Sequence, residues 1–255
     1  MARWISYRHD GRPGFGRIEG DRIDVHAGDL FDSPRATGET LPLSEVTIAL
    51  PCRPSKLIAL WNNFAAMAEK QGLEHPPAPL LFIKPPNSYH PHGAPVAIPT
   101  GVGKLLYEGE LGIVIGRPGR DLTEAQAAEH IFGFTVLNDV TSLDILRGDA
   151  SFMQWTRSKG LDGFSPMGPC IATGIDPMAS RVRVRVDGTE RQNYPLADMI
   201  RKPAELVAML SRGMTLEPGD VIACGTSVGV GSIPPGATVE VEIEGIGILS
   251  NRFEA

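Results

Sequence analysis

Short apolar runs, separated by glycine and proline turns, make up most of this chain. Residues 181–186 alternate arginine with valine and lead into Asp187-Gly188, a pair typical of a hairpin turn. Residues 239–244 alternate valine or isoleucine with glutamate, which places the apolar and acidic side chains on opposite faces of a strand. Continuous apolar runs predict buried strands at residues 56–61, 80–84 and 131–138.

Three segments carry helix signals instead. Residues 62–72 have a helical composition and end in Gly72, and residues 203–213 begin with proline and end with glycine. At residues 123–130, Thr123 and Gln126 have the spacing of a capping box, in which each side chain bonds the backbone of the other. Strands outnumber helices among these segments and dominate the second half of the chain.

The first fifty residues differ from the rest of the chain. Residues 4–7 and 22–25 predict short antiparallel strands joined by glycine turns, and residues 33–53, rich in Ser, Thr, Pro and Gly, predict a connection. We therefore predict a small N-terminal β-subdomain with its linker at residues 1–52 and a main domain at residues 53–255.

Composition narrows the class of protein. A chain of 255 residues can bury a sizeable core, and its net charge of −6 argues against a nucleic-acid partner. We find no signal-peptide pattern at the first residues and no apolar stretch of membrane-spanning length, so we expect a cytoplasmic protein without a membrane partner. Three widely spaced cysteines, Cys52, Cys170 and Cys224, predict buried, reduced thiols.

The candidate chemistry lies in residues 106–116, which predict a strand. Glu108 and Glu110 are two residues apart, so on a strand they share a face, and Gly109 leaves the opposite face open for close packing. Asp139 follows the apolar run of residues 131–138. Two adjacent carboxylates are a common solvated strand face, but three of them also form an oxygen ligand set for Mg²⁺, Mn²⁺ or Ca²⁺.

Further short elements follow in a fixed order over roughly residues 55–253. Besides Glu108 and Glu110 they are Asn138-Asp139, Lys159 with residues 162–164 and Pro166, Gly225-Thr226, residues 242–247, and Asn251-Arg252.

In this combination the chain resembles the fumarylacetoacetate hydrolase family, specifically its short members related to acylpyruvases and to dioate isomerases and decarboxylases. The resemblance implies an α+β, β-rich fold: a mixed β-roll or sandwich domain with a small N-terminal lobe packed beside it. It implies a homodimer as well. It also implies a divalent cation, Mg²⁺ or Mn²⁺, held by Glu108, Glu110 and Asp139, and a small-molecule 2-oxo acid as substrate.

The same resemblance assigns roles to other residues. Lys159 would stabilise negative charge on the substrate, form an ion pair with Glu108 or Asp139, or do both. Gly225 and Thr226 would bind a substrate carboxylate, with turn capping as the other role for Thr226. The resemblance places Asn63 and Glu240 beside the substrate as well, although a solvated strand face is as good a reading of Glu240. The residues themselves make Arg147 and Asp149 candidates for a substrate-facing helix or loop.

One position departs from the family pattern. Where hydrolytic members carry a water-activating histidine, this chain has Met67, and a thioether cannot take up a proton at neutral pH. Glu69, close by in sequence, is one replacement base; His90 and His92, in a turn predicted to be exposed, are others.

Three functions follow. The first is hydrolysis of a C–C bond in an acylpyruvate or fumarylacetoacetate-like diketone, expected first because it is the family's commonest reaction. The second is isomerisation or decarboxylation of a 2-oxo or 2-hydroxymuconate-type diacid in aromatic catabolism, which requires an enolate and proton transfer but no attacking water. Family members with these activities generally keep the histidine, so its loss does not choose between the first two functions. The third is metal and ligand binding without turnover.

Overall fold

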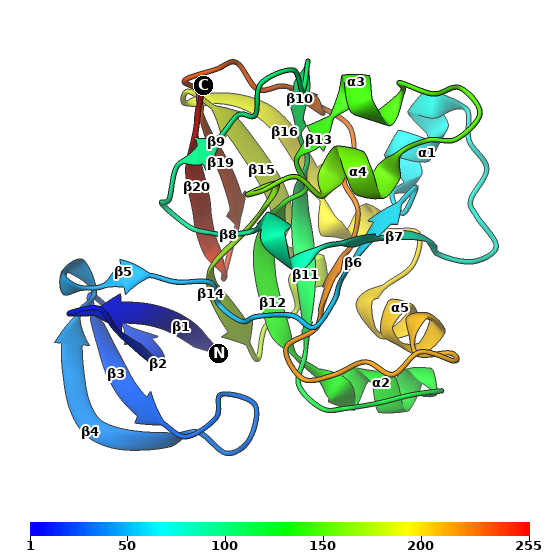
Figure 1. The fold of residues 1–255 in the computed structure, drawn as a ribbon. Helices are drawn as coiled ribbons and strands as arrows, with labels where there is room; N and C mark the ends of the chain where they lie inside the picture. Colours follow the sequence, from blue (N-terminus) through cyan, green and yellow to red (C-terminus); the bar gives the residue numbers. More distant parts are fainter.

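The computed structural model describes residues 1–255, and strands dominate it (Figure 1). The α+β, β-rich class predicted from the sequence is confirmed. Twelve strands form one sheet in the order β4-β3-β2-β1-β14-β12-β11-β17-β6-β7, with β5 paired to β1 and β8 to β14. Their bounds are β1 (Ala2–His9), β2 (Arg12–Glu19), β3 (Arg22–Ala27), β4 (Arg35–Pro42), β5 (Thr47–Ile48), β6 (Leu57–Trp61), β7 (Leu80–Lys84), β8 (Tyr89–Pro91), β11 (Gly109–Ile115), β12 (Ile131–Asn138), β14 (Ser165–Thr173) and β17 (Val221–Ala223).

Two smaller sheets complete the main body. A three-stranded sheet has the order β13-β10-β18, and a five-stranded sheet has the order β16-β15-β19-β20-β9. Valines of β15 and β19 share one large apolar core with Leu111 and Ile113 of β11, so the five-stranded sheet packs on the large one. The bounds are β9 (Val96–Ala97), β10 (Leu105–Tyr107), β13 (Thr141–Ser142), β15 (Arg181–Val186), β16 (Thr189–Pro195), β18 (Gly231–Ser232), β19 (Thr238–Ile243) and β20 (Gly247–Glu254).

Five short α-helices lie outside the sheets, and each predicted helix is present. The capping box of Thr123 and Gln126 is formed, and Gly72 ends its helix in the left-handed conformation, which a side chain would disfavour. None of the helices is long and apolar enough to cross a membrane. The helices are α1 (Ala65–Gln71), α2 (Glu124–His130), α3 (Leu143–Leu146), α4 (Trp155–Lys159) and α5 (Pro203–Leu210).

The N-terminal strands form a lobe beside the main body, joined to it through the pairing of β1 with β14 (Figure 1). The prediction of a plain connection at residues 33–53 is wrong, because this stretch contains β4 and β5. Strand β2, also unpredicted, lies between the two strands that were expected. The side chains of β4 are mostly exposed, so backbone pairing with β3 forms this strand without a hydrophobic pattern that sequence could reveal.

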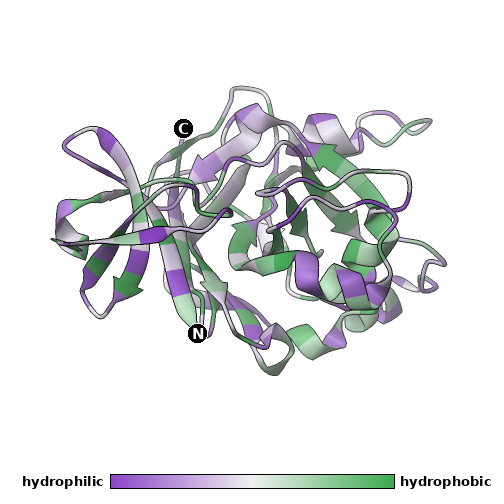
Figure 2. Ribbon diagram, turned by 90° about the horizontal axis from the view of Figure 1, so that it is seen from below, coloured by the Kyte–Doolittle hydropathy of each residue, from purple (hydrophilic) through white to green (hydrophobic).

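Apolar and polar positions alternate along many of the strands (Figure 2). The hairpin predicted at Asp187-Gly188 joins β15 to β16, and both turn residues have positive φ. The arginines of β15 lie on its outer face, where Arg183 and Arg185 pair with Glu242 of β19. The three cysteines are buried and unpaired, as predicted.

The strand predicted at residues 106–116 is interrupted at Glu108. Its first part, β10, pairs with β13 and β18, whereas its second part, β11, pairs with β12 and β17. At the break, the Glu108 N–H donates to the side-chain oxygen of Asn138 at 3.0 Å instead of to a backbone carbonyl of a neighbouring strand. Glu108 therefore lies where the chain passes from one sheet to another.

Gly109 supports this crossing because it lets β11 approach the five-stranded sheet closely, as the sequence predicted. A Cβ atom at this position would lie 2.4 Å from Val184 Cγ2 and 2.9 Å from Val241 Cγ1. Both valines belong to the main core, so there is little room for either to move.

We expect Gly109→Ala to lower the free energy of unfolding by about 1–3 kcal/mol, because overpacking forces the core apart. Chemical denaturation measures this change. Adding Val184→Ala should make the double variant less destabilised than the sum of the two single changes, since the second change removes the overlap. Strict additivity would contradict the packing described.

Candidate metal centre

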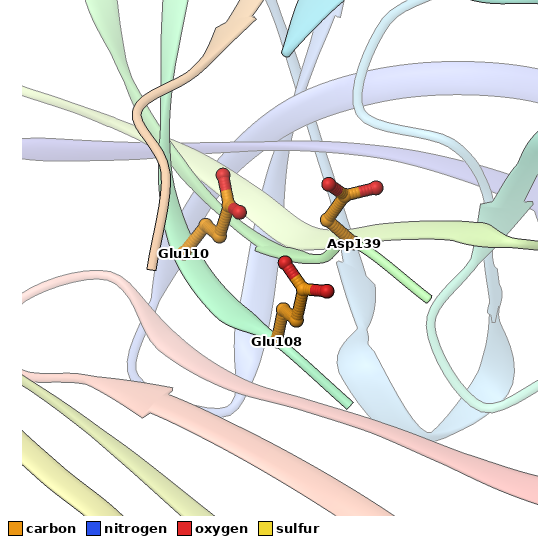
Figure 3. A group of neighbouring side chains, drawn as sticks. All are labelled: Glu108, Glu110 and Asp139. Atoms are coloured by element: carbon orange, nitrogen blue, oxygen red, sulfur yellow. The ribbon is translucent and has the colours of Figure 1, made fainter. Parts of the chain in front are cut away.

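Three carboxylates meet at one end of the β11–β12 pair. The strands are antiparallel with Gly109 opposite Asn138, so the start of β11 lies beside the end of β12. This register brings together Glu108, Glu110 and Asp139, each of which offers an oxygen within 4.8 Å of the others. Figure 3 shows the three carboxyl groups turned toward a common space. The structure thus gathers the ligand set predicted from the sequence.

Lys159 lies against two of these carboxylates. Its Nζ is 2.6 Å from Asp139 Oδ2 and 3.0 Å from Glu108 Oε1, and the side chain is almost completely buried. Burial alone would lower the pKa of Lys159, but Asp139 and Glu108 outweigh it and raise this pKa above its usual value. The ion pair foreseen as one role of Lys159 is present, and the ammonium group remains charged.

A second lysine, Lys84, forms an ion pair with the same aspartate. The sequence analysis did not predict a role for this lysine at the site. Its ammonium bonds Asp139 Oδ1 and donates to the Phe164 carbonyl oxygen at 2.7 Å. Burial lowers the pKa of Lys84, an effect only partly offset by Asp139. One feature of the sequence could have indicated this role. Lys84 shares a face of a short apolar strand with the buried Phe82, and a buried lysine needs a charged partner.

The pKa of Asp139 shows the combined effect of the two lysines. Burial alone would raise this pKa, yet Lys159 and then Lys84 outweigh burial and hold it below its ordinary value. Asp139 is therefore ionised, and both of its oxygens already accept from ammonium groups.

Glu110 is the incompletely satisfied member of the cluster. Its Oε2 accepts from the Gly225 N–H at 2.8 Å, whereas its Oε1 is buried without a hydrogen-bond partner. Burial, followed by repulsion from Asp139 and Glu108, raises its pKa well above the usual value. A buried polar atom without a partner is rare and costly, and a divalent cation among these hard oxygen donors would supply the missing partner. The residues present therefore fit a metal site.

Helix α4 places Lys159 by means of aromatic packing. Trp155, one turn before Lys159, stacks on Phe82 with ring centroids 5.5 Å apart, and Lys159 Nζ lies 5.3 Å from the centre of the same Phe82 ring. Trp61 of β6 contacts Trp155 from the other side. These rings fix a five-residue helix that has no side-chain cap.

A cavity of about 430 Å³ opens onto this cluster. Glu108, Thr141 and Thr226 contribute polar groups, and Glu108 Oε1 accepts from the Thr141 hydroxyl at 2.6 Å. Gln71 and Arg147, both exposed, lie at the mouth. Most of the remaining wall is apolar and includes Leu60, Trp61, Met67, Leu106, Leu143, Leu146, Met153 and Trp155.

The candidate bases are not brought to this cavity. Met67 and Gln71 are one turn apart on α1 and both line the wall, so Glu69, exposed and two residues from each, lies on another side of the helix. His90 and His92 are half-buried rather than exposed as expected. His92 Nδ1 accepts from the Ser250 N–H at 3.1 Å, and His90 Nε2 lies 3.3 Å from the Ala94 oxygen.

The four predicted substrate-binding residues have different surroundings. Thr226 lines the cavity, and its hydroxyl donates to the Gly109 carbonyl at 3.0 Å, while Gly225 holds Glu110. The Asn63 amide donates to the Cys224 carbonyl at 3.0 Å and accepts from the Arg201 N–H, which anchors the Gly225-Thr226 turn.

Glu240 lies elsewhere. It alternates on β19 with Val241, whose side chain packs toward Gly109, so the Glu240 side chain points to the opposite face of the strand. The structure therefore does not bring it to the carboxylate cluster.

Comparisons with known proteins identify the family of this fold. Residues 56–254 match the family described as fumarylacetoacetate (FAA) hydrolase, C-terminal, and residues 2–51 match the one described as Rv2993c-like, N-terminal. The chain belongs to the fumarylacetoacetate hydrolase family, as its motifs indicated.

The similar proteins include several with named activities. Oxaloacetate tautomerase YisK of Bacillus subtilis is 37% identical over 92% of this chain and 84% of its own. A 4-hydroxyphenylacetate degradation bifunctional isomerase/decarboxylase of Salmonella dublin is 39% identical over 92% of this chain and 55% of its own. The crystal structure of 5-carboxymethyl-2-hydroxymuconate delta-isomerase from Mycobacterium smegmatis superposes with a TM-score of 0.92, at 38% identity over 99% of both chains.

We expect Glu110→Gln to stabilise the metal-free protein at neutral pH by about 1–3 kcal/mol, because it removes a buried charge that lacks a partner. The folded state raises the pKa of Glu110. The stability contributed by this group therefore falls as pH rises above the unfolded value of about 4.3, and the variant should lack this decline.

Thermal unfolding of the metal-free protein between pH 4.5 and 8 measures the effect, and calorimetric titration with Mn²⁺ should show weakened binding. Glu108→Gln is the matched control. Since Glu108 already has Lys159 and Thr141 as partners, this change should not stabilise the protein. Equal behaviour of the two variants would contradict the difference between their sites.

We expect Lys84→Met to lower the free energy of unfolding by about 3 kcal/mol, because one oxygen of a buried carboxylate loses its ammonium partner. Urea denaturation of the metal-free protein measures it. Lys56→Met is the control, because Asp220, the partner of Lys56, still accepts from Ser55 at 2.6 Å and from the Glu217 N–H at 2.8 Å. If Lys84→Met lowered the free energy of unfolding no more than Lys56→Met does, a structural role for the ion pair of Lys84 would be ruled out.

Proposed function

We propose that this protein is a divalent-metal-dependent isomerase or decarboxylase of a 2-oxo or 2-hydroxymuconate-type diacid, working through an enolate. One observation carries the proposal. The carboxylate cluster, in which one Glu110 oxygen is buried without a partner, meets a cavity through Glu108, and the wall of this cavity contains no histidine and no other acid. Such a site can stabilise an enolate whose proton is exchanged with water at the open mouth, but it offers no side-chain base to activate water as a nucleophile.

Different residues of the chain would have different roles in the reaction. Glu108, Glu110 and Asp139 would hold Mg²⁺ or Mn²⁺, which as a Lewis acid favours negative charge on the oxygen of a 2-oxo acid. Lys159, permanently charged beside Glu108, adds positive potential at the same place. The apolar residues of the wall lower the local dielectric constant, which strengthens both interactions.

Two lines of support favour this reaction over the hydrolysis expected first. Neither Met67, which lines the cavity at the position of the family's histidine, nor Glu69, on another side of α1, supplies the base that attack by water requires. The related proteins named above are a tautomerase, an isomerase/decarboxylase and an isomerase. Tautomerases and double-bond isomerases move a proton, and decarboxylases break a C–C bond with release of CO₂; none of these reactions requires water as a nucleophile.

The setting of the reaction is part of the proposal. We place the protein in the cytoplasm as a homodimer, acting on a small-molecule 2-oxo acid in aromatic catabolism. Thr226 lines the cavity, and we place the carboxylate next to the oxo group against it; to donate to this carboxylate, its hydroxyl would give up its bond to the Gly109 carbonyl.

The test is a metal-loaded assay with Mg²⁺ or Mn²⁺ on acetylpyruvate, fumarylpyruvate, oxaloacetate and a 2-hydroxymuconate-type diacid. We expect an ultraviolet tautomer shift or release of CO₂ from a diacid, without hydrolytic acid products. Glu108→Ala should lower kcat/KM more than about 100-fold, because a metal ligand is lost.

Glu69→Gln is the control for the alternative base and should leave the rate within about twofold. Hydrolytic products that disappear in Glu69→Gln would restore the hydrolase reading. Metal binding without turnover of any member of the panel would instead favour the non-catalytic reading.

A further inference from the structure

Arg147 is a cation at the cavity mouth whose side chain makes no ion pair or hydrogen bond within the protein. It follows α3 directly, and its N–H is fixed by the Leu143 carbonyl at 3.1 Å, so the backbone is held while the guanidinium is free. The side chain is exposed and lines the cavity.

The acids closest to Arg147 in sequence are both engaged elsewhere. Asp149 accepts from the Ser151 N–H at 2.8 Å and from the Ser151 hydroxyl at 2.6 Å. Asp144 accepts from the Lys104 N–H at 3.4 Å. An arginine without a partner beside two acids that have other partners is available to an external anion.

Polarity changes along the cavity from its base to its mouth. At the base lie Glu108 and the buried Thr141, and the wall beyond them includes Leu106, Leu146 and Trp155. Arg147 is the only lysine or arginine that lines the cavity, so cationic recognition at the mouth depends on this side chain. A ligand matching this sequence has a metal-chelating head, an apolar chain and an anionic far end.

We propose that Arg147 is the specificity-determining residue that binds the far carboxylate of a 2-oxo diacid whose 2-oxo acid head lies at the carboxylate cluster. This inference rests on the function proposed above. A planar guanidinium binds a carboxylate through two parallel hydrogen bonds, and the apolar wall accommodates the carbon chain between the two ends. A 2-oxo acid with an uncharged far end would lack this interaction.

The experiment measures binding rather than turnover. Trp61 and Trp155 line the cavity, so intrinsic fluorescence reports occupancy. The Mg²⁺-loaded protein is titrated with 2-oxoadipate and with 2-oxohexanoate, which share a chain length and differ in the far carboxylate. We expect the diacid to bind about tenfold more tightly, because a charge-assisted pair is gained.

Arg147→Gln should reduce the preference for the diacid to about onefold, because it weakens the binding of the diacid and not that of 2-oxohexanoate. Arg147→Lys should retain part of the preference, because lysine keeps the charge but not the planar guanidinium. The control, Arg212→Gln, removes an exposed arginine outside the cavity and should leave the preference unchanged. The preference of the natural protein should also decline as salt is raised, since the pair is exposed.

An unchanged preference in Arg147→Gln, an equal weakening of both ligands, or failure of the natural protein to bind the diacid would overturn the proposal. Failure of the proposed function gives a different result. In that case the diacid preference depends on Arg147 although no ligand of the assay panel is turned over.

Discussion

The burial of three carboxylates and two ammonium groups beside the end of one strand pair is the constraint on which the rest of the structure depends. Asp139 tolerates burial because Lys84 and Lys159 approach it from β7 and α4. Both elements must dock before the aspartate is satisfied, and Phe82 and Trp155 hold them together. The charged centre thus links segments nearly eighty residues apart, and losing one partner of such a pair is costly.

The cluster divides its charges unequally, and this inequality has functional meaning. Asp139 and Glu108 each have a lysine partner, whereas Glu110 has a single backbone donor and one buried oxygen without any partner. If every carboxylate oxygen were paired within the protein, none would remain to coordinate a cation. The fold instead keeps a deficit of positive charge at the base of an apolar cavity, where electrostatic interactions are strong.

Local chain geometry explains how this centre forms. Interruption of the strand at Glu108 allows the chain to pass from the three-stranded sheet to the large one, and Gly109 permits the close approach that follows. Asn138 replaces the lost ladder bond by accepting from the Glu108 N–H. The break in regular pairing therefore brings Glu108 to the cavity wall, while the five-stranded sheet supports the strand from behind.

The sequence alone determined the strand-rich class, the capping box at Thr123, the hairpin at Asp187 and the identity of the three carboxylates, because each depends on short-range periodicity or on a recognisable motif. It did not reveal β4, the break at Glu108 or the role of Lys84. Nor could it show that Glu69 and Glu240 lie away from the cluster while Arg147 lies at the cavity mouth. These features depend on which strands pair and which side chains share a buried space, and contacts between segments distant in sequence decide both.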